Sequence, residues 1–155
     1  MIEDKRAFVQ FLIAAKRATY AGSGELEPPS RPGSKDLGYR AGEYAYLDSY
    51  LGDREFVGEE AVWAEGQPVW GMNYYGRLLV EAEPEGFGKF LKKALRQAPQ
   101  EAPFRGPSSL QEGRFEYRCN WVGELFWFDG KEEIYLDGNK IYELMFHGGT
   151  VEGRG

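Results

Sequence analysis

Two stretches of this chain decide its fold: residues 56–76, FVGEEAVWAEGQPVWGMNYYG, and residues 128–148, FDGKEEIYLDGNKIYELMFHG. They align without a gap at a constant spacing of 72 residues, and aromatic, aliphatic and glycine residues match at most positions. Each contains an acidic residue followed by glycine between two runs that are rich in aromatic and β-branched residues. Glycine readily adopts the positive φ of a two-residue hairpin turn, so Glu65-Gly66 and Asp137-Gly138 predict two β-hairpins.

Symmetrical pairing around the first turn predicts that Val62 lies opposite Val69, with an equivalent pair, Ile134 and Ile141, in the second stretch. Because successive side chains of a strand point to opposite faces, Glu60 would share the face of Val62. Trp70 would point to the other face. Both faces of the sheet would then carry apolar side chains, and we expect both to be covered.

The matching continues upstream of each hairpin. An FxxFLxxAxR pattern begins at Phe8 and again at Phe87, and the spacing of its apolar residues is that of an amphipathic helix. We predict helices over residues 3–19 and from about Glu85. Each precedes a loop rich in proline, glycine and serine, the longer loop being residues 22–38.

These patterns predict an α+β fold in which a helix-plus-three-strand unit occurs twice. The chain, residues 1–155, would be a single domain made of two pseudo-symmetric units, about 3–80 and 81–151. Its sheet would be mainly antiparallel with two packed helices, and a cleft would lie between the two units.

The composition argues against several classes of function. A net charge of −6 gives no basic face, so we expect no direct binding to nucleic acid. Lys16 and Arg17 interrupt the apolar N-terminal stretch, which is unlike a signal peptide or a membrane span. Cys119 is the single cysteine, which suits a reducing cytoplasm. No nucleotide-binding glycine motif follows a predicted strand, and we expect no cofactor and no metal site.

Two pairs of charged residues are candidates for a binding site. Glu60 and Glu132 occupy matching positions beside aromatic strands, and a carboxylate in an apolar cleft is able to bind a cation or act as an acid or base. The alternative is a glutamate that is solvated or paired with an arginine. Arg31 and Arg105 each lie in the loop after a helix, where a guanidinium suits a carboxylate or phosphate ligand. Their alternative is an ion pair, including one with those glutamates, that fixes each loop.

The remaining candidates are a histidine and several aromatic residues. His147 is the single histidine and a candidate base, alone or with Cys119 as a nucleophile pair; a structural cysteine and a hydrogen-bonded histidine are the favoured alternative. The aromatic residues either line a pocket for a flat or cationic ligand or form the core. We assign no catalytic residue, and the predicted ligand-binding residues are Glu60, Glu132, Trp70, Tyr142, Tyr75, His147, Arg31 and Arg105.

Several short motifs resemble an uncharacterised prokaryotic family of domains of unknown function, whose members occur alone or fused behind an Xre-type helix-turn-helix region. The motifs are FLIAAKRATYAG, SRPGSKDLGY, DSYLG, GEEAVW, PVWGMNYYGR, FRGPSS and FHGG. The resemblance extends from about Phe8 to Gly149 and implies a module that takes the place of a regulator's sensor domain. No helix-turn-helix segment precedes residue 8, so we do not expect this chain to bind DNA itself.

We therefore expect a sensor-like module that binds a small molecule in an aromatic and acidic cleft between the repeats. A cationic or amphipathic aromatic ligand would fit Glu60, Glu132, Trp70 and Tyr142 best. The alternatives are a small acid/base enzyme that uses a glutamate or His147, and an oligomerisation or interaction module without a ligand. The sequence is compatible with a homodimer in all three cases.

Overall fold

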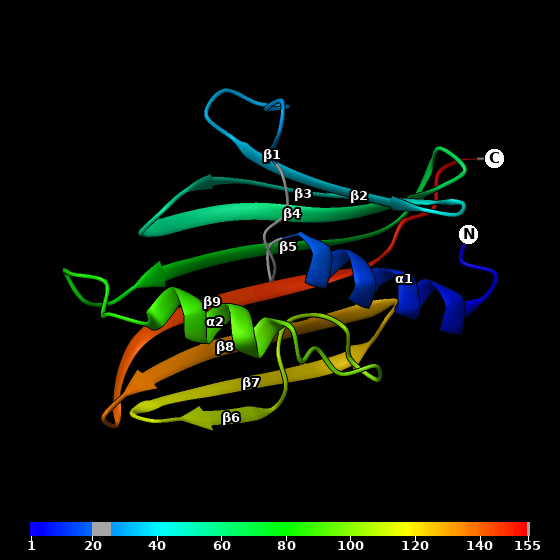
Figure 1. Ribbon diagram of the computed structural model, residues 1–155. Helices are drawn as coiled ribbons and strands as arrows, with labels where there is room; N and C mark the ends of the chain where they lie inside the picture. Colours follow the sequence, from blue (N-terminus) through cyan, green and yellow to red (C-terminus); the bar gives the residue numbers. More distant parts are fainter. Residues whose placement is uncertain (20–25, 155) are drawn as a thin grey trace.

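The computed structural model describes residues 1–19 and 26–154, which form two helices and nine strands (Figure 1). The helices are α1 (Lys5–Ala18) and α2 (Phe87–Leu95). The strands are β1 (Leu26–Glu27), β2 (Lys35–Ala41), β3 (Tyr44–Gly52), β4 (Glu55–Ala64), β5 (Gln67–Leu78), β6 (Ser109–Glu112), β7 (Phe115–Glu124), β8 (Trp127–Leu136) and β9 (Asn139–Thr150). Neither helix has the length and apolar character needed to cross a membrane.

All described strands belong to one antiparallel sheet, in the order β1-β2-β3-β4-β5-β9-β8-β7-β6. β1 to β5 follow one another as a meander, and β6 to β9 form a second meander that runs back toward the first. β5 and β9 pair along their length, from Trp70 opposite Thr150 to Leu78 opposite Tyr142. This pairing makes the two meanders continuous.

The predicted α+β class is wrong, because the chain is mostly β: a single extended sheet accompanied by two helices. A helix-plus-three-strand unit does not recur either, since five strands follow α1 and four follow α2. The β5–β9 pairing joins the two predicted units edge to edge in one sheet. The division into pseudo-symmetric units at about 3–80 and 81–151 stays a prediction.

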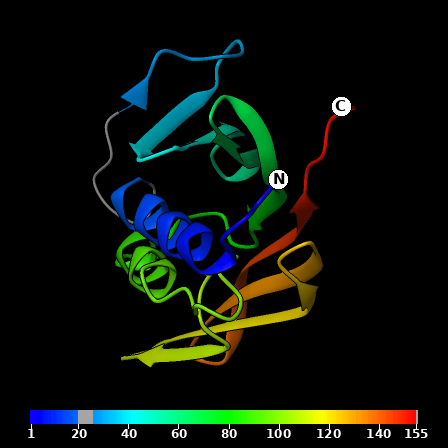
Figure 2. The same ribbon diagram turned by 90° about the vertical axis from the view of Figure 1, so that its right-hand side faces the viewer.

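Both helices lie on the same face of the sheet, which curves around them (Figure 2); we call this the inner face. α1 begins where the Asp4 side chain accepts a hydrogen bond from the Ala7 amide at 3.0 Å, which satisfies one of the free N–H groups of the first turn. Phe8 of α1 packs edge-on against Trp70 of the sheet, with ring centroids 6.1 Å apart. Residues 22–25 of the predicted loop lie outside the described residues, and the remainder of that loop contains β1 and the start of β2.

The two predicted hairpin turns are confirmed. Glu65 and Gly66 join β4 to β5 with φ of 49° and 82°, and Asp137 and Gly138 join β8 to β9 with φ of 50° and 82°. Two successive positive φ angles define the turn that matches the twist of the flanking strands. The sequence therefore locates both hairpins correctly.

The predicted register of these hairpins is wrong by one residue. Val62 lies opposite Trp70, not Val69, and Ile134 lies opposite Tyr142. The cause is an irregularity in each ladder just after Val62 and just after Ile134. A one-residue shift moves a strand's side chains to the other face, so Trp70 and Tyr142 point to the inner face and are buried.

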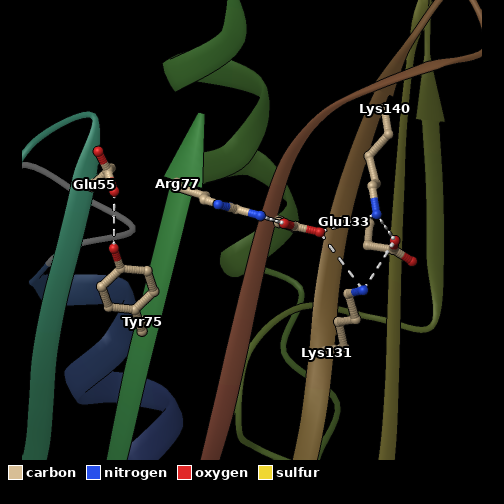
Figure 3. A network of polar contacts seen from close by, with 7 residues as sticks. Glu55, Tyr75, Arg77, Lys131, Glu133 and Lys140 are labelled. Atoms are coloured by element: carbon tan, nitrogen blue, oxygen red, sulfur yellow. Dashed lines mark hydrogen bonds and ion pairs between the residues drawn. The ribbon is translucent and has the colours of Figure 1, made fainter. Parts of the chain in front are cut away.

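The face of the sheet opposite the helices, the outer face, is not covered by any described element, contrary to the prediction. Trp127 is 76% exposed and Met145 is 68% exposed. Charged side chains occupy much of this face: Arg77 pairs with Glu143 at 2.8 Å, and Lys140 contacts Glu133 at 3.1 Å (Figure 3). The outer face is therefore a solvated surface with scattered apolar residues.

Candidate ligand-binding cavity and its buried charges

A cavity of about 590 Å³ lies between the inner face of the sheet and α2. Its walls are mostly apolar, and its floor contains polar side chains from β3, β5, β9 and the segment after α2. The apolar lining residues include Leu37, Tyr50, Phe56, Leu78, Phe87, Leu91 and Leu95. The polar floor consists of Asp48, Tyr74, Arg105 and Tyr142. A second cavity, of about 650 Å³, lies beside α2, Glu112 and Phe115, but no buried charged residue lines it.

Glu132 forms the best-satisfied part of the buried polar cluster. Arg105 holds it with two hydrogen bonds, Nε to Oε2 at 3.0 Å and Nη2 to Oε1 at 2.8 Å. Tyr142 donates to Oε1 at 2.7 Å and Tyr117 donates to Oε2 at 2.5 Å. Each oxygen of this fully buried carboxylate thus accepts two hydrogen bonds. Burial, together with the neighbouring Glu132 charge, raises the pKa values of Tyr117 and Tyr142 well above the usual tyrosine range.

Glu60 is less well satisfied. Lys16 of α1 donates to Glu60 Oε1 at 2.6 Å and to the Phe104 carbonyl at 2.7 Å. Burial lowers the pKa of Lys16, although the Glu60 charge opposes this effect. The second oxygen, Glu60 Oε2, is buried and accepts no hydrogen bond from any described residue.

Asp48 brings a further carboxyl group to the same place. It lies directly opposite Glu60 in the β3–β4 ladder, is 1% exposed, and accepts a hydrogen bond from Tyr74 at 2.5 Å. Among residues 1–19 and 26–154 it forms no ion pair, because Lys16 and Arg105 pair with the two glutamates. Burial first, and the Glu60 charge second, raise the pKa of Asp48 to about 7 despite the opposing effects of Tyr74, Arg105 and Lys16.

The cluster is therefore unbalanced in charge. Within the described part of the chain it contains three buried carboxyl groups, Asp48, Glu60 and Glu132, and two buried cations, Lys16 and Arg105. A buried charge without a partner is costly, so such a group takes up a proton unless a counter-charge arrives. Asp48, which faces the cavity, is the group best placed to hold that proton.

Three of the predicted site residues meet at one point. Arg105, Glu132 and Tyr142 are joined by hydrogen bonds, and Arg105 and Tyr142 also line the cavity. Glu60 and Trp70 are completely buried below it and are not lining residues. Trp70 Nε1 donates to the Leu125 carbonyl at 3.1 Å, which indicates a structural position for this indole.

The other predicted residues lie elsewhere. Tyr75 is 48% exposed on the outer face and donates to Glu55 at 3.1 Å (Figure 3). His147 is also exposed on that face, whereas Cys119 is buried on the inner face, so the two do not form a nucleophile pair. Burial raises the pKa of Cys119 to about 12, which makes it a poor nucleophile. Arg31 donates to Ser49 at 2.7 Å, away from the cavity.

Sequence reasoning missed Asp48 and Lys16 as parts of this cluster. One signal was available for Asp48, which lies in the DSYLG motif, two residues before Tyr50. The alternation of that strand toward the buried side could have indicated an inward-facing carboxyl group. No comparable signal exists for Lys16, because a lysine in the last turn of a helix is normally solvated.

The structure thus defines a mostly β domain with a cavity above a buried cluster of charges. Residues 48–151 match the family described as Domain of unknown function (DUF5680), and the chain belongs to this family. The match begins at Asp48 and includes Arg105 and Tyr142, whereas Lys16 lies upstream of it. The expected kinship with a family of domains of unknown function is confirmed. No curated protein matches the chain, and no solved structure matches it.

Proposed function

We propose that this protein binds a small amphipathic organic molecule in the cavity between the sheet and α2. The observation that carries the proposal is Asp48, a buried carboxyl group without an ion-pair partner among the described residues, at the floor of a mostly apolar cavity. Ligand sites generally combine apolar walls with a few convergent polar groups. The volume of about 590 Å³ is also within the range of such sites.

The walls and the floor suggest how the ligand lies. Its apolar part would contact Phe56, Phe87 and Leu91, which come from both sides of the cavity. Its polar end would reach Asp48, next to Tyr74, which donates a hydrogen bond to that carboxyl group. The cavity takes its lining from both predicted units, for example Asp48 and Phe56 from the first and Phe87 and Arg105 from the second.

Acid/base catalysis is the second candidate, and Asp48 is also the observation that favours it. A carboxyl group with a pKa of about 7 is suited to exchange protons near neutral pH. The predicted enzyme used a glutamate or His147, whereas Asp48 is the group that reaches the cavity. A role as a regulator's sensor beside a helix-turn-helix partner, a homodimer and a cytoplasmic location stay predictions.

Filling the cavity tests the proposed binding function. Leu91→Trp adds bulk to the α2 wall without touching the polar floor, and the control Leu79→Trp makes the same change at a residue outside the cavity. A ligand at a hundredfold excess over its Kd stabilises the folded protein by about 2.7 kcal/mol. We expect thermal shifts from a metabolite library in the wild type and the control but not in Leu91→Trp. Shifts that survive Leu91→Trp would place binding elsewhere, and a complete absence of shifts would contradict the proposal.

A further inference from the structure

The charge of the ligand follows from the groups that surround Asp48. Lys16 approaches from α1, Glu60 from β4, Tyr74 from β5 and Arg105 from the segment after α2. Lys16 and Arg105 are already held by Glu60 and Glu132. The described cluster consequently has one more carboxyl group than it has cations.

We infer that the ligand is an organic monocation and that its binding releases the proton held by the Asp48 carboxyl group. This inference rests on the proposed binding function and names its ligand class. The exchange is balanced: the O–H bond of Asp48 breaks, the proton passes to solvent, and the carboxylate that remains pairs with the cation. The complex has one positive charge less than the free protein and free ligand together, and the released proton carries that charge into solvent.

An anionic ligand fits the cavity less well. Arg105, the cation on the cavity floor, already gives two hydrogen bonds to Glu132. Lys16, the other buried cation of the cluster, does not line the cavity, so an anion beside Asp48 gains no counter-charge from it. The cavity rim adds no preference, because Lys35 and Lys92 are offset by Asp53 and Glu83.

The walls favour a cation with an apolar or aromatic body. Tyr50, Phe56 and Tyr74 line the same cavity as Asp48, and aromatic faces attract cations, most strongly where water is excluded. Tyr74 in addition ties Asp48 to β5 through its hydroxyl group. A head group that pairs with Asp48 would therefore contact aromatic rings as well as the carboxylate.

Three probes with the same phenylethyl body separate charge from shape. Phenethyltrimethylammonium is a permanent cation with no proton to lose, (3,3-dimethylbutyl)benzene is its neutral isostere, and 3-phenylpropionate is an anion. Isothermal calorimetry of the cation in two buffers with different ionisation enthalpies counts the protons that the protein releases. Because Asp48 has a pKa of about 7, we expect close to one proton released at about pH 6 and almost none at about pH 9.

The affinity for the cation should rise about tenfold per pH unit below pH 7 and level off above it. Asp48→Asn should abolish the proton release and the pH dependence, and weaken the binding at least about tenfold. The matched control Asp53→Asn, at a carboxylate on the cavity rim, should change neither. The wild-type pH profile supplies a test that does not depend on the folding of any variant.

Several results would overturn the inference. Equal or tighter binding of the neutral or anionic probe would do so while leaving the proposed function intact. Cation binding without proton release at about pH 6, or binding that Asp48→Asn does not weaken, would overturn it as well. Failure of the cation to bind at millimolar concentration would count against it in the same way, and the Leu91→Trp experiment would then decide the proposed function separately.

Discussion

The two meanders of the sheet each bury a glutamate at a matching position, but they neutralise it differently. Glu60 pairs across the ladder with Asp48, whereas Glu132 pairs with Cys119 at the corresponding place. Glu132 accepts four hydrogen bonds from Arg105, Tyr117 and Tyr142. Glu60 accepts one, from Lys16. The Glu132 network is therefore fully hydrogen-bonded, whereas the Glu60 network is unbalanced in charge and brings Asp48 to the cavity.

This difference indicates which carboxyl groups are structural and which is available to a ligand. A buried ion pair in which every oxygen is satisfied is rigid, and removing one partner leaves the other charge unpaired. A buried carboxyl group without a counter-ion weakens the folded state and persists where function requires it. Glu132 belongs to the first kind, and Asp48 to the second.

The largest expected effect is on stability when Glu132 is neutralised. Glu132→Gln leaves the Arg105 guanidinium buried without a counter-ion, and we expect it to lower the free energy of unfolding by about 3 to 5 kcal/mol. Glu60→Gln should cost less, about 1 to 2 kcal/mol, because Lys16 keeps the Phe104 carbonyl and gains Asp48 as a counter-ion. Urea denaturation of both variants measures the difference. Equal costs would remove the distinction between the two meanders.

A smaller effect is expected from pH, and its sign is specific. Asp48 has a pKa of about 7 in the folded protein against the usual 3.8, so the folded state binds the proton more tightly. The stability that this proton provides is fully present below about pH 4 and is lost as pH rises through about 7, at roughly 1.4 kcal/mol per pH unit.

Asp48→Asn removes this titrating group without changing its size. The variant should therefore gain stability relative to the wild type as pH rises from about 5 to about 8. Urea midpoints of both proteins across this range check the prediction, with Asp53→Asn as the matched control. A constant difference between wild type and Asp48→Asn would show that Asp48 titrates alike in the folded and unfolded states.

The smallest effect is expected on the outer face. Arg77 is 51% exposed and pairs with Glu143. Hydrogen bonds from Arg77 and Lys140 lower the pKa of Glu143 to about 2. Exposed ion pairs contribute little because solvent screens them, so Arg77→Ala should leave the urea midpoint within experimental error at neutral pH. A clear loss of stability would indicate that this face is buried in an assembly.

The sequence predicted local structure better than overall architecture. Glu65-Gly66 and Asp137-Gly138 fix their turns through backbone conformation alone, and the two helices follow from the spacing of apolar residues after Phe8 and Phe87. The class was wrong because short strands such as β1, Leu26–Glu27, have no distinctive pattern of their own. The register was wrong because symmetrical pairing around the turn takes no account of the irregularity after Val62.

The candidate site was predicted only in part, for a related reason. Arg105, Glu132 and Tyr142 were recognised because their positions recur or follow a loop, and the structure joins them through hydrogen bonds. Asp48 has no counterpart in the second meander, where Cys119 occupies the matching position. A search for recurring residues therefore passes over Asp48, a buried carboxyl group that the second meander lacks at the matching position.

The most direct test of this distinction is a pH titration of the Asp48 carboxyl group that is monitored by carbon-13 NMR. The Asp48→Asn variant assigns the carboxyl signal. We predict a pKa near 7 in the free protein, and a clear fall of that pKa when phenethyltrimethylammonium is added. Titration at the usual value near 3.8 would contradict the unbalanced cluster, and a pKa that the cation leaves unchanged would contradict the cation site.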